Sequence, residues 1–290
     1  MHWVLQNNLF NEAGFQRLLD TLERMGISHS LHKVIPFIGV LSPPLSKGED
    51  FTFPDEFDEN YEPDLPPGPK IVMGSYSMAI YAAKKGWTPG AFANENHDYS
   101  VQVEHWGDAM LNHDARIFPF CEIPKDPAGK RKLFFIRPVA DSKCFAGHVC
   151  SWSQYQEWRT KILTLGADNG GTLEPSTLVM VSPVREIYRE YRLWVVDGEI
   201  VTSSLYKEGG RVIYREVPSD DPVLRYAWRY SGHPMIADTW VPARAFVLDI
   251  AETPDGYKIL EVNCLNAAGF YAADLQKLVM ALEGMNYNEN

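Results

Sequence analysis

Three polar side chains interrupt a hydrophobic hairpin pattern in the last quarter of the chain. The stretch FVLDIAETPDGYKILEVN (residues 246–263) has two apolar runs on either side of a turn, and Asp249, Glu261 and Asn263 lie within these runs. Carboxylate and amide oxygens are the hard ligands that Mg²⁺ prefers in proteins. The residue types therefore indicate a cation site, provided that the fold brings them together.

The turn between the two runs predicts how these side chains are placed. Pro254–Gly256 suits a type I turn closed by a glycine bulge, because proline presets φ and glycine tolerates a positive φ. With the residues on either side of this loop facing each other, Asp249 lies opposite Glu261, and Asn263 falls on the same face. Two carboxylates that face each other across an antiparallel pair repel. The alternative to a cation site is an ordinary hairpin whose polar side faces solvent.

Two arginines and a lysine occur in the same half of the chain as these carboxylates. Arg137 ends an apolar run and Lys143 follows it in a loop, while strand alternation places Glu190 and Arg192 on one face of EYRLWVV. Arginine forks and lysine charges suit phosphate oxygens, so the set predicts triphosphate binding. Each cation also has a structural alternative. Arg137 could pair with a structural carboxylate, Lys143 could be a solvated loop residue, and Arg192 could pair with Glu190.

The familiar phosphate-binding and nucleophile motifs are missing from the sequence. It contains no GxxxxGK[ST] loop, no GxGxxG after a strand and no GxSxG elbow. Their absence disfavours P-loop NTPases, Rossmann dehydrogenases, ordinary protein kinases and serine hydrolases.

Composition and charge limit the class of protein further. The 290 residues are 45% hydrophobic and 22% charged, as in soluble globular proteins, and no apolar run approaches the length of a membrane span. The formal charge is −11, of which Glu49–Asp64 contributes −8, and no basic surface for a nucleic-acid backbone is evident. The four cysteines form no CxxC pair and the N-terminal stretch does not resemble a secretory signal, so we expect reduced thiols and a cytoplasmic location.

Strands and helices alternate in the first part of the chain, which predicts an open α/β sheet there. The second part is predicted to be α+β with antiparallel sheets, because Asp197-Gly198 is a strong hairpin signal, and an amphipathic helix is expected within residues 269–284. The main expected elements before the boundary near residues 122–130 are strands at 2–6, 30–36 and 70–74, helices at 15–25 and 75–86, and an acidic, proline-rich loop at 41–69.

The motifs FIRPVADSK, EYRLWVVDGEIV and FVLDIAETPDGYKILEVN, followed by CLNAAGFY, together resemble the ATP-grasp superfamily. They look most like the clade that is named for two arginines and a lysine and occurs in bacterial and phage proteins. The resemblance covers about residues 130–284. It implies an ATP-grasp domain at 126–290, with two α+β lobes that clasp ATP, after an α/β pre-ATP-grasp domain at 1–125.

The resemblance also implies roles for residues that match the motifs of the family. Asp249, Glu261 and Asn263 match the metal-binding acid, glutamate and asparagine, which would hold Mg²⁺ against the phosphates of ATP. Arg137 stands where many relatives have a lysine at the α-phosphate, and Lys143 falls in the loop over the phosphates.

The remaining matches concern the nucleoside and the reacting groups. Arg192 would contact the γ-phosphate or the carboxylate under attack. Glu190 matches a position that often binds ribose hydroxyls. The segment Val181-Ser182-Pro183-Val184 falls at the hinge that receives adenine through its backbone.

By this resemblance the protein is expected to be an ATP- and Mg²⁺-dependent, ADP-forming ligase. Such enzymes join a carboxylate to an amine or a thiol through an acylphosphate, and a peptide or an amino acid is the candidate substrate. Two alternatives remain open: a nucleotide-binding module without ligase chemistry, and a phosphotransferase that acts on a hydroxyl. The sequence predicts neither a nucleic-acid nor a membrane partner, and it does not indicate the oligomeric state.

Overall fold

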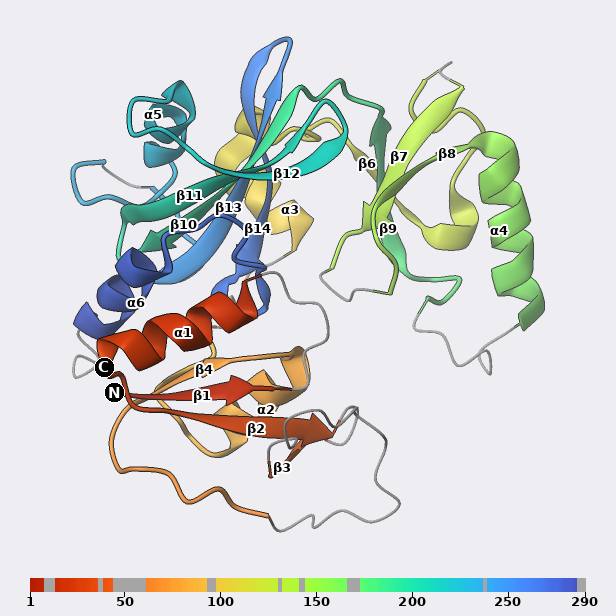
Figure 1. Ribbon diagram of the computed structural model, residues 1–290. Coiled ribbons are helices and arrows are strands. Elements are labelled where there is room, and N and C mark those ends of the chain that lie inside the picture. Colours follow the sequence, from red (N-terminus) through yellow and green to blue (C-terminus); the bar gives the residue numbers. More distant parts are fainter. Residues whose placement is uncertain are drawn as a thin grey trace. The chain divides into compact units, whose positions relative to one another are not determined.

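The computed structural model of the protein describes residues 1–7, 14–35, 39–43, 61–92, 98–129, 132–140, 144–165, 173–236 and 239–285. The chain forms two compact units, each built from separate segments (Figure 1). The first unit contains Met1–Glu95, Glu190–Asp249 and Val262–Asn290, and the second contains Asn96–Arg189 and Ile250–Glu261. These units are not the same as the two domains predicted from the sequence, residues 1–125 and 126–290. That domain division stays a prediction.

The first unit contains the expected α/β sheet. Its strand order is β3-β2-β1-β4-β5, and β1 runs parallel to both β2 and β4. The elements are β1 (His2–Gln6), α1 (Phe15–Met25), β2 (His29–Ile35), β3 (Val40–Ser42), β4 (Lys70–Met73), α2 (Tyr76–Lys84) and β5 (Pro89–Gly90). Residues 41 and 42 thus belong to β3 and not to the predicted loop 41–69, whose residues 44–60 lie outside the described part of the chain.

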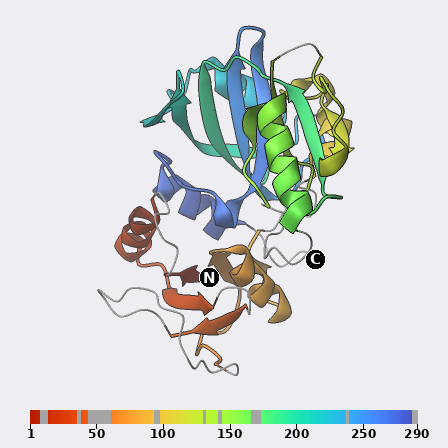
Figure 2. The same cartoon turned by 90° about the vertical axis from the view of Figure 1, so that its right-hand side faces the viewer.

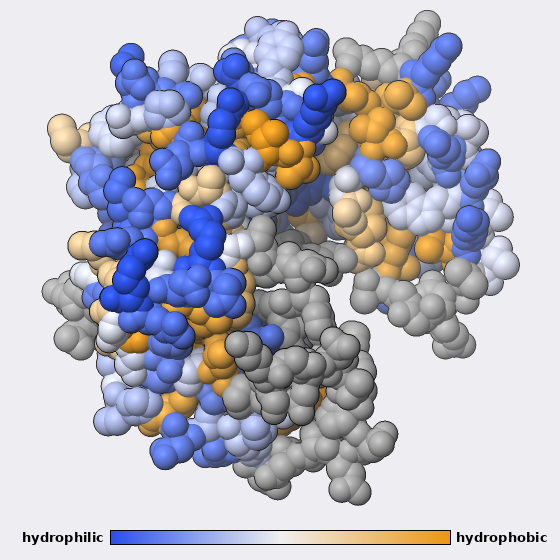
Figure 3. All heavy atoms as spheres, in the orientation of Figure 1, coloured by the Kyte–Doolittle hydropathy of each residue, from blue (hydrophilic) through white to orange (hydrophobic). Residues whose placement is uncertain are grey.

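Helices cover both faces of this sheet because its central strands are apolar on both sides. Trp3 and Leu5 of β1 pack into a core with α1, whereas Val4 packs into a different core with α2. Near-continuous hydrophobic runs are typical of parallel strands that are buried on both faces. The outward side of α1 carries hydrophilic side chains (Figure 3).

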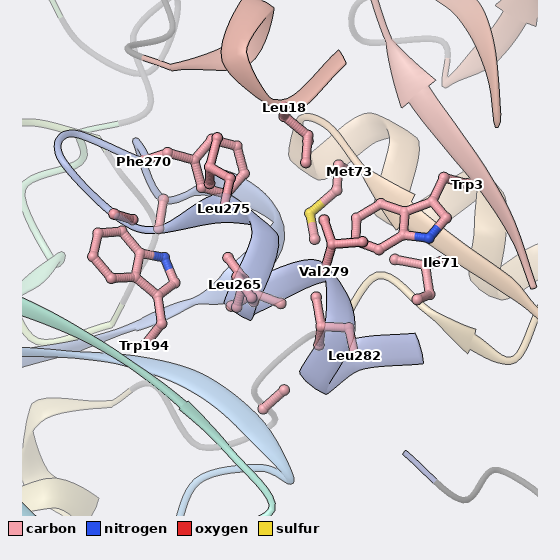
Figure 4. Packing of buried hydrophobic residues seen from close by; sticks show 14 of the residues in the cluster. Trp3, Leu18, Ile71, Met73, Trp194, Leu265, Phe270, Leu275, Val279 and Leu282 are labelled. Atoms are coloured by element: carbon pink, nitrogen blue, oxygen red, sulfur yellow. The ribbon is translucent and has the colours of Figure 1, made fainter. Parts of the chain in front are cut away.

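The C-terminal helix α6 (Leu275–Gly284) completes the core of the first unit. Val279 and Leu282 of α6 lie beside Trp3 and Ile71 of the sheet, and Trp194 contributes to the same core (Figure 4). The predicted helix within 269–284 begins only at residue 275, because the segment before it folds back onto a neighbouring strand. There the backbone N–H groups of Ala272 and Asp274 donate to Ser204 Oγ and Thr202 Oγ1.

A second sheet has the order β12-β11-β10-β13-β14. Its strands are β10 (Arg189–Val196), β11 (Glu199–Glu208), β12 (Arg211–Glu216), β13 (Ala245–Thr253) and β14 (Gly256–Cys264), and α5 (Pro222–Trp228) follows β12. Asp197 and Gly198 have φ values of 45° and 83°, as the predicted Asp-Gly hairpin requires. Gly256 has φ 97°, which matches its predicted place in the turn between β13 and β14.

The second unit contains an antiparallel sheet with the order β6-β9-β7-β8, and α4 lies across it (Figure 2). Its strands are β6 (Arg116–Pro119), β7 (Leu133–Pro138), β8 (His148–Ser151) and β9 (Leu178–Pro183), and its helices are α3 (Tyr99–Trp106) and α4 (Trp152–Leu165). Phe120, Phe134 and Tyr155 share its core, and the Tyr155 hydroxyl donates to the Phe120 carbonyl at 2.6 Å. None of the described helices is both long and apolar enough to cross a membrane.

A buried chain of hydrogen bonds links two histidines in the first unit. His2 contacts Ser28 Oγ at 2.7 Å and Ser30 Oγ at 2.9 Å, and Ser30 Oγ lies 2.9 Å from His32 Nε2. Both imidazoles are 5% exposed. Burial, and then the neighbouring His2, lower the pKa of His32 to about 4, so the folded protein keeps this ring neutral where an unfolded chain would protonate it.

We therefore expect acid to destabilise the fold through His32. Between pH 6.5 and pH 4 the unfolded state binds more protons at this residue than the folded state does. Lowering the pH through this range therefore reduces the free energy of unfolding by up to about 3 kcal/mol. Urea unfolding at pH 7 and pH 4.5 should show a smaller loss for His32→Gln than for the wild type. His148→Gln, at an exposed position of β8, is the control. If His32→Gln lost as much stability between pH 7 and pH 4.5 as the wild type, His32 would not be the source of the acid sensitivity.

Candidate functional site

A buried arginine and a buried aspartate form a two-pronged ion pair in the first unit. Arg192 on β10 donates through Nε to Asp249 Oδ1 at 2.8 Å and through Nη2 to Oδ2 at 2.7 Å. Only 8% of Arg192 and 1% of Asp249 is exposed. Burial by itself would lower the pKa of Arg192, but the charge and hydrogen bonds of Asp249 raise it above its ordinary value, so the guanidinium stays charged.

Asn263 extends this pair into a group of three. It lies on β14, next to the β13 strand of Asp249, and its Nδ2 donates to Asp249 Oδ2 at 3.1 Å. The structure thus brings together three of the residues that the sequence predicted, Arg192, Asp249 and Asn263. Their arrangement fixes one carboxylate between a guanidinium and an amide.

Glu190 precedes Arg192 by two residues on β10 and has different partners. Lys207 Nζ donates to its Oε1 at 2.6 Å, and the Tyr206 hydroxyl donates to its Oε2 at 2.9 Å. Burial, with smaller effects from the charges of Asp249 and Glu190, raises the pKa of Tyr206, which keeps the hydroxyl protonated. One structural alternative had Arg192 paired with Glu190. The structure pairs Arg192 with Asp249 instead.

Lys207 and Tyr206 were not predicted from the sequence. The only local signal is the polar sequence YKE at the end of strand β11. Glu190 on β10, the partner of Lys207, is 17 residues away in the sequence. A polar strand end next to a hairpin is common on solvent-exposed surfaces, so this signal by itself would not have singled out either residue.

Three tyrosines stack beside the guanidinium of Arg192. The Tyr271 ring stacks on Tyr206 at a centroid distance of 5.2 Å and on Tyr214 at 4.9 Å. Arg192 Cζ lies 4.8 Å from the centroid of Tyr271 and 5.5 Å from that of Tyr206. Guanidinium groups are attracted to the faces of aromatic rings, so the tyrosines add to the fixing of Arg192.

The second unit holds another predicted pair. Arg137 at the end of β7 donates through Nη1 to Glu261 Oε2 at 2.8 Å, and the two side chains are 19% and 35% exposed. Glu261 and Asn263 are two residues apart on β14, so their side chains leave this strand on the same side. Lys143 lies outside the described residues, and its predicted role stays a prediction.

The predicted hinge segment forms the end of β9 and the residue after it. Val181 and Ser182 are buried, Pro183 is the last residue of the strand, and Val184 is 37% exposed. The Ser182 hydroxyl donates to Asn112 Oδ1 at 2.9 Å, which holds this strand end in place. Asn112 is 70 residues away in the sequence, and no motif indicated it.

The chemistry of these side chains fits magnesium and a polyphosphate. Among the described residues, no group of three or more histidines, cysteines, aspartates and glutamates is arranged to hold a metal by itself. Mg²⁺ is usually bound through one or two carboxylates together with the phosphates of the substrate, so such a group is not needed. Asp249 and Glu261 each accept a hydrogen bond from an arginine at 2.7–2.8 Å, so both carboxylates lie beside positive charge in this structure.

Comparisons with known proteins identify the family and the fold of the chain. A family model matches residues 47–282; it describes the ATP-grasp domain of family 3 in the clade named for two arginines and a lysine. A search of curated proteins gave no match. Similar solved structures include a D-alanine–D-alanine ligase from Bacillus anthracis, with 10% identity, coverage of 98% of this chain and 96% of that chain, and a TM-score of 0.55.

Two further structures have the same fold. D-cycloserine synthetase DcsG is 13% identical, with coverage of 97% and 98% and a TM-score of 0.54. The ATP-grasp ligase PsnB, solved with a minimal precursor, is 13% identical, with coverage of 97% of each chain and a TM-score of 0.52. The expected ATP-grasp fold and clade are thereby confirmed, and the protein belongs to family 3 of the ATP-grasp clade that is named for two arginines and a lysine.

Proposed function

We propose that the protein is an ATP- and Mg²⁺-dependent ligase that joins a carboxylate to an amine or a thiol and forms ADP. The observation that carries this proposal is the buried group of Arg192, Asp249 and Asn263. Burying a charged pair costs free energy, and apolar side chains of similar volume stabilise a core at least as well. A buried pair of this kind therefore indicates a functional role. Membership of an ATP-grasp family supports nucleotide binding as that role.

In this proposal Asp249, Glu261 and Asn263 hold Mg²⁺, which would neutralise charge on the β- and γ-phosphates. Arg192 binds the γ-phosphate or the attacking carboxylate. Asp249 occupies its Nε and Nη2 atoms, and Nη1 donates to the Gly269 carbonyl at 3.5 Å, so the guanidinium is held in one orientation. A donor that is held in position before the reaction costs no reorganisation when charge develops.

The other predicted residues bind the nucleotide. Arg137 and Lys143 contact the phosphates, and the backbone of 181–184 receives adenine. Glu190 binds the ribose hydroxyls, and Lys207 and Tyr206 orient its carboxylate through hydrogen bonds of 2.6 and 2.9 Å.

The reaction has two steps. An oxygen of the substrate carboxylate attacks the γ-phosphorus, and the bond from that phosphorus to the bridging oxygen of ADP breaks. The nitrogen or sulfur of the second substrate then attacks the carbonyl carbon of the acylphosphate and releases phosphate. An amino acid or a peptide is proposed as the substrate class, since the similar structures include a D-alanine–D-alanine ligase and PsnB with a precursor peptide.

Isothermal titration of ATP, with Mg²⁺ and with EDTA, tests the nucleotide site. We expect binding that requires Mg²⁺ and that weakens in Asp249→Asn. Asn263→Ala is the second variant, because loss of the buried charge at Asp249 could unfold the protein. A screen of acid and amine pairs for ADP release then tests the ligase reaction. Absence of ATP binding would contradict the proposal, and so would ADP release that requires an alcohol in place of an acid.

A further inference from the structure

The first half of β11 has an open edge. The strand runs from Glu199 to Glu208, but its pairing with β12 begins at Ser204, which faces Glu216. Its other neighbour in the sheet is β10. Within the described part of the chain, residues 199–203 therefore have no strand partner on the β12 side. An unpaired strand edge presents backbone N–H and C=O groups that can pair with another chain.

A cavity of about 730 Å³ lies along this open edge. Residues 199–203 form one wall, and residues 216–219, where the chain leaves β12, form another. Leu224 and Trp228 of α5 and the start of α6 complete the lining, and both helices contact β11 (Figure 1). We call this cavity the β11 groove. Its volume falls within the range of about 300–1,000 Å³ that is typical of ligand sites.

The lining of the β11 groove combines apolar surface with negative charge. Ile200, Leu224 and Trp228 supply hydrophobic area, and the indole of Trp228 is 37% exposed. The charged residues of the lining are three carboxylates and one lysine: Glu199, Glu216, Asp274 and Lys277. Asp274 lies 3.6 Å from Lys277 and Glu199 lies 3.0 Å from His233, and the lining keeps a net negative charge. An aromatic face next to carboxylates is suited to lysine or arginine side chains, whose stems are apolar and whose ends are positive.

We propose that the β11 groove binds an extended, basic segment of a partner polypeptide, which adds a strand to the open edge of β11. Strand addition gives affinity through backbone hydrogen bonds and selectivity through pockets for alternate side chains. At about 3.3 Å per residue, the edge has room for a segment of about five residues. Neither Arg192 nor Asp249 lines the groove, so the proposal does not depend on the ligase reaction.

Titration of defined peptides into the full chain, without nucleotide, tests this proposal. The probe is acetyl-KVKVKVK-amide, which alternates basic and β-branched residues. One control is the same peptide with every backbone amide N-methylated, which removes the N–H donors, and the other replaces each lysine with glutamate. We expect the probe to bind and each control to bind at least tenfold more weakly.

A pair of matched variants assigns the binding to the groove. Glu216→Gln removes a carboxylate of the lining, and Glu208→Gln removes one on the paired end of β11, outside the lining. We expect Glu216→Gln to weaken the probe about threefold, as for a partly exposed ion pair, and Glu208→Gln to leave it unchanged. Thermal unfolding by circular dichroism confirms that both variants are folded.

Several outcomes would overturn the proposal. Equal binding of the N-methylated peptide would exclude strand addition, and equal binding of the glutamate peptide would exclude a basic partner. No binding of the probe at millimolar concentration would exclude the site. If sedimentation shows that the chain associates with itself and that the probe dissociates this assembly, the occupant of the edge is a second copy of the protein and not a basic partner.

Discussion

Replacing Arg192 with methionine is expected to lower the free energy of unfolding by about 3–5 kcal/mol. The reason is that Asp249, with 1% exposure, loses the positive charge that neutralises it in the interior of the first unit. The double variant Arg192→Met/Asp249→Leu should recover much of this loss, because it removes both charges and places apolar side chains in the space. Urea unfolding of the wild type, the two single variants and the double variant measures the coupling energy directly.

The chain offers an ion pair of the same geometry on its surface as the control. Arg244 donates to Asp197 through Nε and Nη2 at 2.7 Å each, but the two side chains are 50% and 42% exposed. The same cycle on this pair should give a coupling energy of about 0.2–1 kcal/mol. Similar coupling energies for the two pairs would show that burial does not set the strength of the Arg192–Asp249 pair.

The second large effect is expected on catalysis. If Glu261 binds Mg²⁺, Glu261→Gln replaces a charged ligand with a neutral one, and we expect Mg²⁺-dependent ADP formation to fall by about 10²–10³-fold. The fold should be retained, because the side chain is 35% exposed and its pair with Arg137 contributes little to stability. Steady-state rates at increasing Mg²⁺ measure the effect, and high Mg²⁺ should restore part of the activity.

Glu252→Gln is the matched control for this experiment. Glu252 lies on the other strand of the same hairpin, pairs with Arg189 at 3.3 Å and is 29% exposed, so it resembles Glu261 in all but its proposed role. Its replacement should leave the rate within about a factor of two, as for a surface ion pair. A comparable loss in both variants would mean that the hairpin needs its charges for stability and not for the metal.

Features that depend on neighbours in the sequence were predictable. Asp197-Gly198 and Pro254–Gly256 indicated turns because only certain residues accept a positive φ, and the structure places turns there. The alternation of EYRLWVV placed Glu190 and Arg192 on one strand, β10. The family resemblance, which rests on the order of three short motifs, predicted the ATP-grasp fold correctly.

Contacts between distant residues were not predictable in the same way. Asp249, the partner of Arg192, is 57 residues away, and its identity depends on the order of the strands and not on any local preference. The start of α6 shows the same limit. The expected helix reached back to residue 269, but Tyr271 adopts φ 42° and stacks on Tyr206, and the helix begins at Leu275 after the cap Asp274.

The position of α6 in the core has a consequence for synthesis on the ribosome. Trp3 donates through Nε1 to Glu283 at 2.6 Å, and Trp3 and Met73 are covered by a cluster that includes Leu278 and Leu282. The apolar side of the N-terminal sheet therefore cannot be fully buried until residues 275–285 have been translated. Emerging chains that expose apolar surface are prone to aggregate. We therefore expect the nascent chain to need shielding of this surface until residues 275–285 have left the ribosome.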